Sequence, residues 1–287
     1  MSYEITVDPK IEMLGILEYF ADPKIPVLLA DKIVDPHDQD YVHRIISKFA
    51  PLKDHKAIHQ LIKMKEQNFK TNQAVRLLLY HSQIPYLFSQ PVIQNQKHLE
   101  WIGMLREWIE NTGFPTFLEK NQLYYKELVE FAENQLEQVP LCDIIELFFG
   151  EKRTSYHIYL SAIHTGNYDV FLPNKGIGAL IGAPILKASD LPKRILKEFA
   201  YSFIRPAVDL HWSLFQSVKE NANLSREKVY DLLAKAIQAV LLGEQDLDIS
   251  EISWLYLPIM NEYQKNRRLY PNFSSFIPSI ASQNWSY

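Results

Sequence analysis

The chain has 287 residues, which is enough to bury a large hydrophobic core in one large domain or two ordinary ones. Hydrophobic residues make up 47% of the sequence and charged residues 22%, a balance that excludes wholesale disorder. The net charge is −4 and the basic residues are scattered, so the sequence lacks the positive patch of a nucleic-acid-binding protein.

Residues 1–150 are predicted to be helical, because apolar residues return at every third or fourth position. Asp8 and Pro9 are typical of a helix start, as N-cap and first helical residue. Pro51 and Gly113 mark two helix ends. The 16 tyrosines and 15 phenylalanines, against only 9 glycines, also favour helices with bulky contacts over a turn-rich β-sandwich.

Cys142 is the only cysteine of the chain, so an intrachain disulfide and a cysteine-based zinc site are excluded. It lies beside Leu141 and Ile144, and we interpret it as a small core residue. No stretch approaches the apolar length of a membrane span, and the first residues do not resemble a signal peptide. We expect a soluble protein, located in the cytoplasm or exported if a signal peptide has been removed.

The helical pattern is interrupted at about residues 156–187, where we predict a small antiparallel sheet. Residues 156–160 and 168–172 are β-prone and flank a turn signal at 164–167, which together indicate a hairpin. The glycine-rich residues 176–182 follow. Their GxGxxxG spacing, with no Lys-Ser/Thr after it, argues against a nucleotide-binding loop and favours a loop or a third strand.

Helical periodicity returns after residue 190, with Pro206 disturbing the first helix. A second helix covers about 226–242, with Ser225 as its N-cap and Gly243 at its end. One more helix is expected near 251–266, followed by a tail rich in Pro, Ser and Asn.

The order of elements is helices, a small sheet and helices again. This order predicts one predominantly helical α+β unit over residues 1–287. Its first part, 1–150, is helical, and its second part, 151–287, holds the sheet and the C-terminal helices. No low-complexity linker or internal repeat divides the two parts.

The helix after the predicted sheet carries the sequence Lys-Glu-Phe-Ala-Tyr at residues 197–201. A zinc metallopeptidase has HExxH at this place, since residues four apart lie on one helix face and two imidazoles can bind one zinc ion. The glutamate between them polarises a metal-bound water. Here Glu198 is in register with that glutamate, while Lys197 and Tyr201 occupy the two histidine positions.

At these residues the chain resembles a mostly bacterial zincin-like family, domain of unknown function 4932, whose helix is similar to HEFSHSFVNP. Two earlier stretches are similar to the VDPRIELLSI-like opening and the FAPYKDHPAV-like segment of that family. The matching residues are 7–17, 49–51 with 54–57, 198–199, 202–203 and 205–206. The resemblance implies a gluzincin-type scaffold, in which an acidic residue on the next helix completes the metal site. Asp231 is the nearest candidate for that third position, and Glu227 is the alternative.

The substitutions remove the metal chemistry that the resemblance implies. The ammonium group of Lys197 has no lone pair and repels a cation, and Tyr201 is a neutral phenol with a pKa of about 10. Without zinc, Glu198 has no metal-bound water to activate. We therefore expect no metal and no cofactor, with a Lys197–Glu198 contact in the place of the metal, although adjacent residues diverge on a helix.

Three functions follow from these residues. The first is a catalytically inactive peptidase-like protein whose cleft binds a peptide, a small ligand or a protein partner. The second is a metal-independent enzyme rebuilt around Lys197, Glu198 and Tyr201, with acid–base chemistry that requires a shifted lysine pKa. The third is a purely structural helical domain whose surface mediates assembly, and a closed, filled cleft would indicate it. Residues 197–201 could also be part of an ordinary helix with Lys197 and Glu198 in solvent.

The histidines offer weaker alternatives. His55 and His59 stand four apart on a predicted helix and could share a metal ion, but flanking lysines favour a solvated face. His157 and His164 have no acidic partner nearby in sequence. A serine–histidine–acid triad assembled from distant residues stays open, since its members need not be close in sequence.

Overall fold

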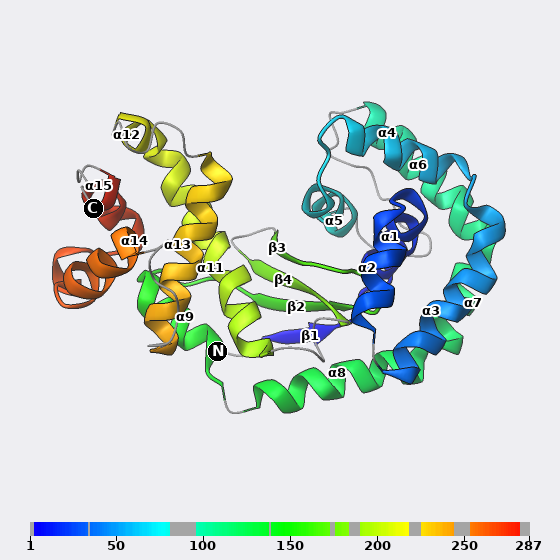
Figure 1. Cartoon of the computed structure of the whole chain (residues 1–287), viewed down its shortest axis with the longest axis horizontal. Helices are drawn as coiled ribbons and strands as arrows, with labels where there is room; N and C mark the ends of the chain where they lie inside the picture. Colours follow the sequence, from blue (N-terminus) through cyan, green and yellow to red (C-terminus); the bar gives the residue numbers. More distant parts are fainter. Residues whose placement is uncertain are drawn as a thin grey trace.

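The computed structural model is predominantly helical with one small sheet, which confirms the predicted α+β class. Figure 1 shows the sheet in the middle, with most helices of the first part of the chain on one side and the helices after residue 190 on the other. The structure describes residues 3–33, 35–80, 96–137, 139–172, 176–183, 190–217, 225–243 and 253–281.

Apart from strand β1 (Glu4–Thr6), the described residues of the first part are helical, as predicted, and residues 81–95 of that part lie outside the described residues. The helices are α1 (Pro9–Ala21), α2 (Lys24–Lys32), α3 (Pro36–Phe49), α4 (Lys56–Glu66), α5 (Thr71–Tyr80), α6 (Gln96–Thr112), α7 (Phe114–Lys120), α8 (Gln122–Leu136) and α9 (Leu141–Phe149), with a 3-10 turn at Ala50–Leu52. Asp8 caps α1 by accepting a hydrogen bond from the backbone N–H of Lys10, and Pro9 is the first helical residue. Gly113 has a φ of 59° between α6 and α7, a left-handed conformation that glycine adopts without strain.

The sheet contains β1 (Glu4–Thr6), β2 (Tyr156–Ser161), β3 (Asn167–Phe171) and β4 (Ile177–Gly182), in the spatial order β1-β2-β4-β3. The first three strands in that order are parallel, and only β3 runs antiparallel to its neighbour. Ile158 of β2 and Asp169 of β3 both lie opposite Ala179 of β4. The sheet is therefore mixed.

The prediction of an antiparallel sheet with a β2–β3 hairpin is wrong. The two strands are separated by β4, whose six residues are all buried and apolar or glycine, so it takes a central position. Strand β3 carries Asn167 and Asp169 and lies at the edge. The predicted third strand is confirmed as β4, β1 was not predicted, and residues 184–187 of the predicted sheet lie outside the described residues.

The helices of the second part are α11 (Leu191–Leu210), α12 (Trp212–Ser217), α13 (Arg226–Leu242), α14 (Ser253–Pro258) and α15 (Phe273–Ala281). Helix α14 continues directly as a π-helical segment (Ile259–Gln264), and a 3-10 turn (Arg267–Leu269) precedes α15. Ser225 caps α13 and Gly243 ends it in a left-handed conformation, as predicted. Helix α11 continues through Pro206 for another turn. It packs against α13, β3 and β4, and Ala207 and Val208 beyond the proline are buried.

The tail rich in Pro, Ser and Asn contains the helix α15, which was not predicted. Its apolar residues follow a helical spacing, and Phe273, Phe276, Ile277 and Ile280 are all buried. The serines and Pro278 between them resemble a loop composition and conceal this periodicity. Residues 251–252 of the predicted preceding helix and the last six residues lie outside the described part.

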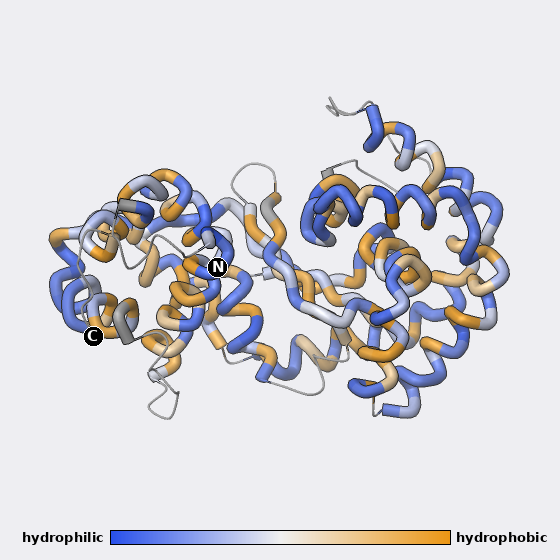
Figure 2. The backbone as a smooth tube through the Cα atoms, turned by 45° about the horizontal axis from the view of Figure 1, so that its top comes forward, coloured by the Kyte–Doolittle hydropathy of each residue, from blue (hydrophilic) through white to orange (hydrophobic). Residues whose placement is uncertain are grey.

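One hydrophobic cluster connects the helices and the sheet, from Ile11 in α1 through Leu180 in β4 to Ala281 in α15. Figure 2 shows the hydrophobic residues mostly on the faces that the helices turn toward one another and toward the sheet. Cys142 is buried in this core, as predicted. Among the described helices, none is sufficiently long and apolar to span a bilayer.

The contact of α1 with the loop after β2 leaves no room at Gly15, where a Cβ atom would lie 2.9 Å from Nδ1 of His164 and would overlap Ile163. We expect Gly15→Ala to lower the free energy of unfolding by roughly 1–3 kcal/mol through this overlap. Gly103 is the matched control, because it also lies in a helix and a Cβ atom there meets nothing within 4 Å. Gly103→Ala should be stabilising by about 0.4–1 kcal/mol. Equal effects of both changes in urea denaturation would contradict the packing described for α1.

Candidate functional site

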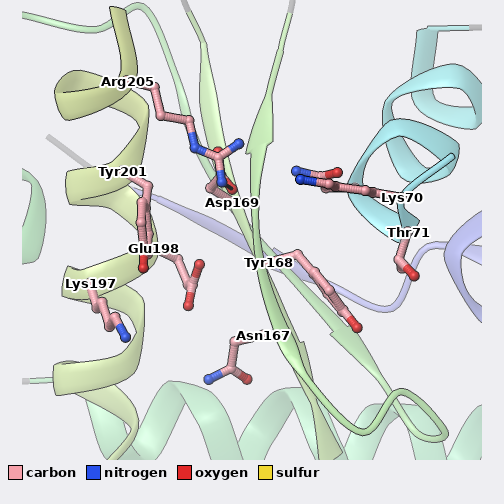
Figure 3. Close-up of a pocket in the computed structure, with 10 residues that line it drawn as sticks. Lys70, Thr71, Asn167, Tyr168, Asp169, Lys197, Glu198, Tyr201 and Arg205 are labelled. Atoms are coloured by element: carbon pink, nitrogen blue, oxygen red, sulfur yellow. Dashed lines mark ion pairs between the residues drawn. The ribbon is translucent and has the colours of Figure 1, made fainter. Parts of the chain in front are cut away.

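A cleft of about 320 Å³ lies between α11 on one side, the start of α5 on the other and β3 beneath. Figure 3 shows side chains from all three elements directed toward it. Three predicted site residues, Lys197, Glu198 and Tyr201, line the cleft. Its complete lining is Lys70, Thr71, Asn72, Asn167, Tyr168, Asp169, Lys197, Glu198, Tyr201 and Arg205.

The fourth predicted residue, Asp231, lies on helix α13 and contacts both Lys197 and Tyr201. Lys197 Nζ lies 2.9 Å from Asp231 Oδ1, and the Tyr201 hydroxyl donates a hydrogen bond of 2.8 Å to the same oxygen. Lys197 and Tyr201 are one helical turn apart on α11, so one acceptor can reach both. The other carboxylate oxygen, Oδ2, lies 3.0 Å from Lys235 Nζ.

These contacts determine the electrostatics of Asp231. Burial acts to raise the pKa of its carboxyl, but the hydrogen bonds from Lys197, Lys235 and Tyr201 outweigh burial and lower that pKa to about 2. Burial and the hydrogen bond to Asp231 raise the pKa of Tyr201, which keeps the phenol protonated. The expected Lys197–Glu198 contact is not formed, because the two side chains diverge and Lys197 reaches Asp231 instead.

Glu198 occupies the interior of the cleft. Its residue surface is only 7% exposed, and Figure 3 shows its carboxylate in the space between α11 and β3. Within the described part of the chain it has no hydrogen-bond or ion-pair partner. Burial, and then the negative charge of Asp169, raise the pKa of Glu198 to about 8.

Asp169 and Arg205 form an ion pair next to Glu198 that the sequence analysis did not predict. Arg205 Nη2 lies 2.9 Å from Asp169 Oδ1, and Asp169 is 3% exposed. Burial raises the pKa of Asp169, while the charge of Arg205 opposes that shift. A charged residue within the β-prone run 168–172 was the only local signal, and its partner is 36 positions away in α11.

Two alternatives from the sequence analysis lie away from this cluster. Glu227 is exposed and pairs with Lys70 at 3.3 Å rather than with Lys197 or Tyr201. His55 caps α4, with its Nδ1 accepting a hydrogen bond of 3.2 Å from the backbone N–H of Ala57, which favours a capping role over metal binding.

His164, by contrast, has an acidic partner that sequence proximity did not reveal. Its Nε2 lies 3.3 Å from Glu18 Oε2, and its Nδ1 lies 2.9 Å from Ser161 Oγ. Burial acts to raise the pKa of Glu18, but His164 and Lys65 outweigh burial and lower that pKa to about 2. A serine, a histidine and an acid in this order are typical of hydrolases.

Ser161 does not have the exposure of a nucleophile. It is fully buried, and its hydroxyl donates a hydrogen bond of 2.9 Å to Glu12. A second cavity of about 210 Å³ borders Glu18 and His164 and shares Thr71 and Tyr168 with the first, but Ser161 does not line it. We therefore interpret this cluster as a structural connection between α1 and the sheet.

Comparisons of the chain with models of protein families, with curated proteins and with solved structures found no match. The structure's described residues include no group of three or more His, Cys, Asp or Glu side chains placed to hold a metal ion.

The raised pKa of Glu198 predicts a pH-dependent loss of stability. Its ordinary pKa of 4.5 applies to the unfolded chain, so between about pH 4.5 and 8 the folded state retains a proton that the unfolded state has released. This contribution to stability is complete below pH 4.5 and is lost as the pH rises to 8, by roughly 3–5 kcal/mol in total. Glu198→Gln should not show this loss, because its amide stays neutral.

Urea denaturation of Glu198→Gln and of the wild type at pH 5 and pH 8 measures the difference. Glu119→Gln is the control, since Glu119 is exposed on α7. If Glu198→Gln followed the wild-type pH profile, the assignment of a buried, neutral carboxyl to the cleft would be wrong.

Proposed function

We propose that this protein is a zincin-like, catalytically inactive relative of zinc metallopeptidases that uses the retained cleft to bind a peptide segment. One observation carries the proposal. Residues 197, 201 and 231, to which the family resemblance assigns the metal ligands, meet at a single oxygen atom, Asp231 Oδ1. Residues 197 and 201 lie one turn apart on α11, and the acceptor that reaches both comes from helix α13, as is expected if the three positions derive from one former metal site.

The charges at this point support an inactive site. The ammonium groups of Lys197 and Lys235 compensate the carboxylate of Asp231, and a divalent cation would have to displace both. An ammonium group has no lone pair to offer a metal. The cation–carboxylate contact that a metal would make is replaced by an ion pair between two helices.

The alternative of a rebuilt, metal-independent enzyme has less support. With a pKa of about 8, Glu198 is mainly protonated at neutral pH, so it suits a general acid and a separate general base would be required. A general base at Lys197 would first have to release Asp231, 2.9 Å away. The third alternative, a purely structural domain, does not explain why a polar cleft of about 320 Å³ is left open.

The position of β3 at the edge of the sheet favours a peptide as the ligand. This strand lies at the edge of the sheet and borders the cleft with Asn167, Tyr168 and Asp169. An edge strand can form backbone hydrogen bonds with an added extended peptide, while neighbouring side chains select its sequence. The cleft would then hold the peptide side chains between α5 and α11.

Restoring both histidines tests the origin of the site. We expect the double change Lys197→His and Tyr201→His to create zinc affinity, because the two imidazoles and Asp231 then supply three ligands and the lysine charge is removed. Zinc should raise the melting temperature of the double variant through linkage and leave the wild type unchanged. Adding Asp231→Ala to the double variant is the control and should weaken zinc binding. A folded double variant with no more zinc affinity than the wild type would rule out a former metal site.

The absence of catalysis is tested separately with an unfolded, fluorescently labelled protein as substrate. We expect no turnover by the wild type, with or without added zinc, since no metal-bound water is available to Glu198. Cleavage that Glu198→Gln abolishes would show instead that the cleft has acquired its own chemistry.

A further inference from the structure

All the cationic side chains that line the cleft form ion pairs, but among the described residues one of its carboxyl groups does not. Each cation that lines the cleft has an anionic partner: Lys197 pairs with Asp231, Arg205 with Asp169 and Lys70 with Glu227. Glu198 is only 7% exposed. In the part of the chain that the structure describes, its carboxyl group has neither a hydrogen bond nor an ion pair. Among the ionisable groups that line the cleft, the one without a partner is therefore an acid.

Other oxygen atoms of the lining also lack donors. Asn72 Oδ1, Asn167 Oδ1 and Asp169 Oδ2 are buried and have no hydrogen-bond partner. These residues come from α5 and β3, whereas Glu198 comes from α11, so the oxygens surround the cleft from different elements. Among the lining residues, Arg205 Nε is the one buried nitrogen without a hydrogen-bond partner. Unpaired acceptors in the cleft therefore outnumber unpaired donors. Buried acceptors without donors cost free energy, which a ligand that supplies donors would recover.

An ammonium group supplies what this cleft lacks. It carries three N–H donors on a compact centre and a positive charge that complements Glu198 and Asp169. A positive charge beside Glu198 also favours its ionised form. A metal ion fits less well, because no described group of three His, Cys, Asp or Glu side chains is placed to hold one.

We propose that the cleft recognises a primary ammonium group of its peptide ligand, supplied by the N-terminal amine or by a lysine side chain, with Glu198 as the central acceptor. This proposal rests on the proposed function, since it takes the ligand to be a peptide. It specifies which group of the peptide the cleft recognises.

The experiment uses the full chain and pools of random hexapeptides, all amidated at the C-terminus so that the carboxylate does not vary. Each pool is made with a free or an acetylated N-terminus, and with lysine included or omitted. Retention on the immobilised protein is measured by mass spectrometry. We expect pools with an ammonium group to be retained roughly tenfold better than the acetylated, lysine-free pool. The free, lysine-free pool and the acetylated, lysine-containing pool distinguish the two sources.

Glu198→Gln should reduce this preference roughly tenfold, because its neutral amide cannot ionise beside the ammonium group and forms only a weaker hydrogen bond. Glu119→Gln, on the exposed face of α7, should leave the preference unchanged. Equal retention of all pools would overturn ammonium recognition and leave peptide binding intact. Retention of no pool, together with a thermal shift by n-butylamine that Glu198→Gln removes, would overturn peptide binding and support the ammonium site. A shift by calcium or magnesium chloride but not by the amine would overturn the proposal in favour of a metal site.

Discussion

Two carboxylates of α1 hold the first part of the chain on the sheet. Glu12 is fully buried and accepts hydrogen bonds from the Tyr41 hydroxyl, from Ser161 and from the backbone of Ala162, so it joins α1, α3 and the end of β2. Burial raises the pKa of its carboxyl, and these donors oppose that shift. These hydrogen bonds offset the large free-energy cost of burying a carboxylate, and loss of one of them would leave part of that cost uncompensated.

The same helix determines the position of one wall of the cleft. Glu18 accepts a hydrogen bond of 2.6 Å from the Thr71 hydroxyl at the start of α5 and lies 2.7 Å from Lys65 Nζ on α4. Thr71 borders both the cleft and the second cavity, and so does Tyr168. The distance between the two sides of the cleft therefore depends on contacts deep in the N-terminal part, far from the residues that would meet a ligand.

The opposite wall depends on Asp231, which links α13 to two successive turns of α11. An ion pair between Lys197 and Asp231 retains the attraction that a metal ion would provide between two helices, but without a Lewis acid. If the cleft derives from a metallopeptidase site, as we propose, this ion pair explains how the scaffold keeps its cleft without the metal. On the same proposal, Glu198 no longer activates water and is a buried acceptor, for which an ammonium group of the ligand is the partner.

Local features of this protein follow from the sequence alone, because they depend on neighbours a few residues apart. The caps at Asp8 and Ser225 and the shared helix face of Lys197 and Tyr201 belong to this group. The central place of β4, the pairing of Asp169 with Arg205 and the contact of Glu18 with His164 were decided by the tertiary structure. The last two contacts join residues 36 and 146 positions apart. The low dielectric of the core strengthens such contacts and makes a buried charge without a partner costly. The sequence determines which side chains carry charge, and the fold determines which of those charges find a partner.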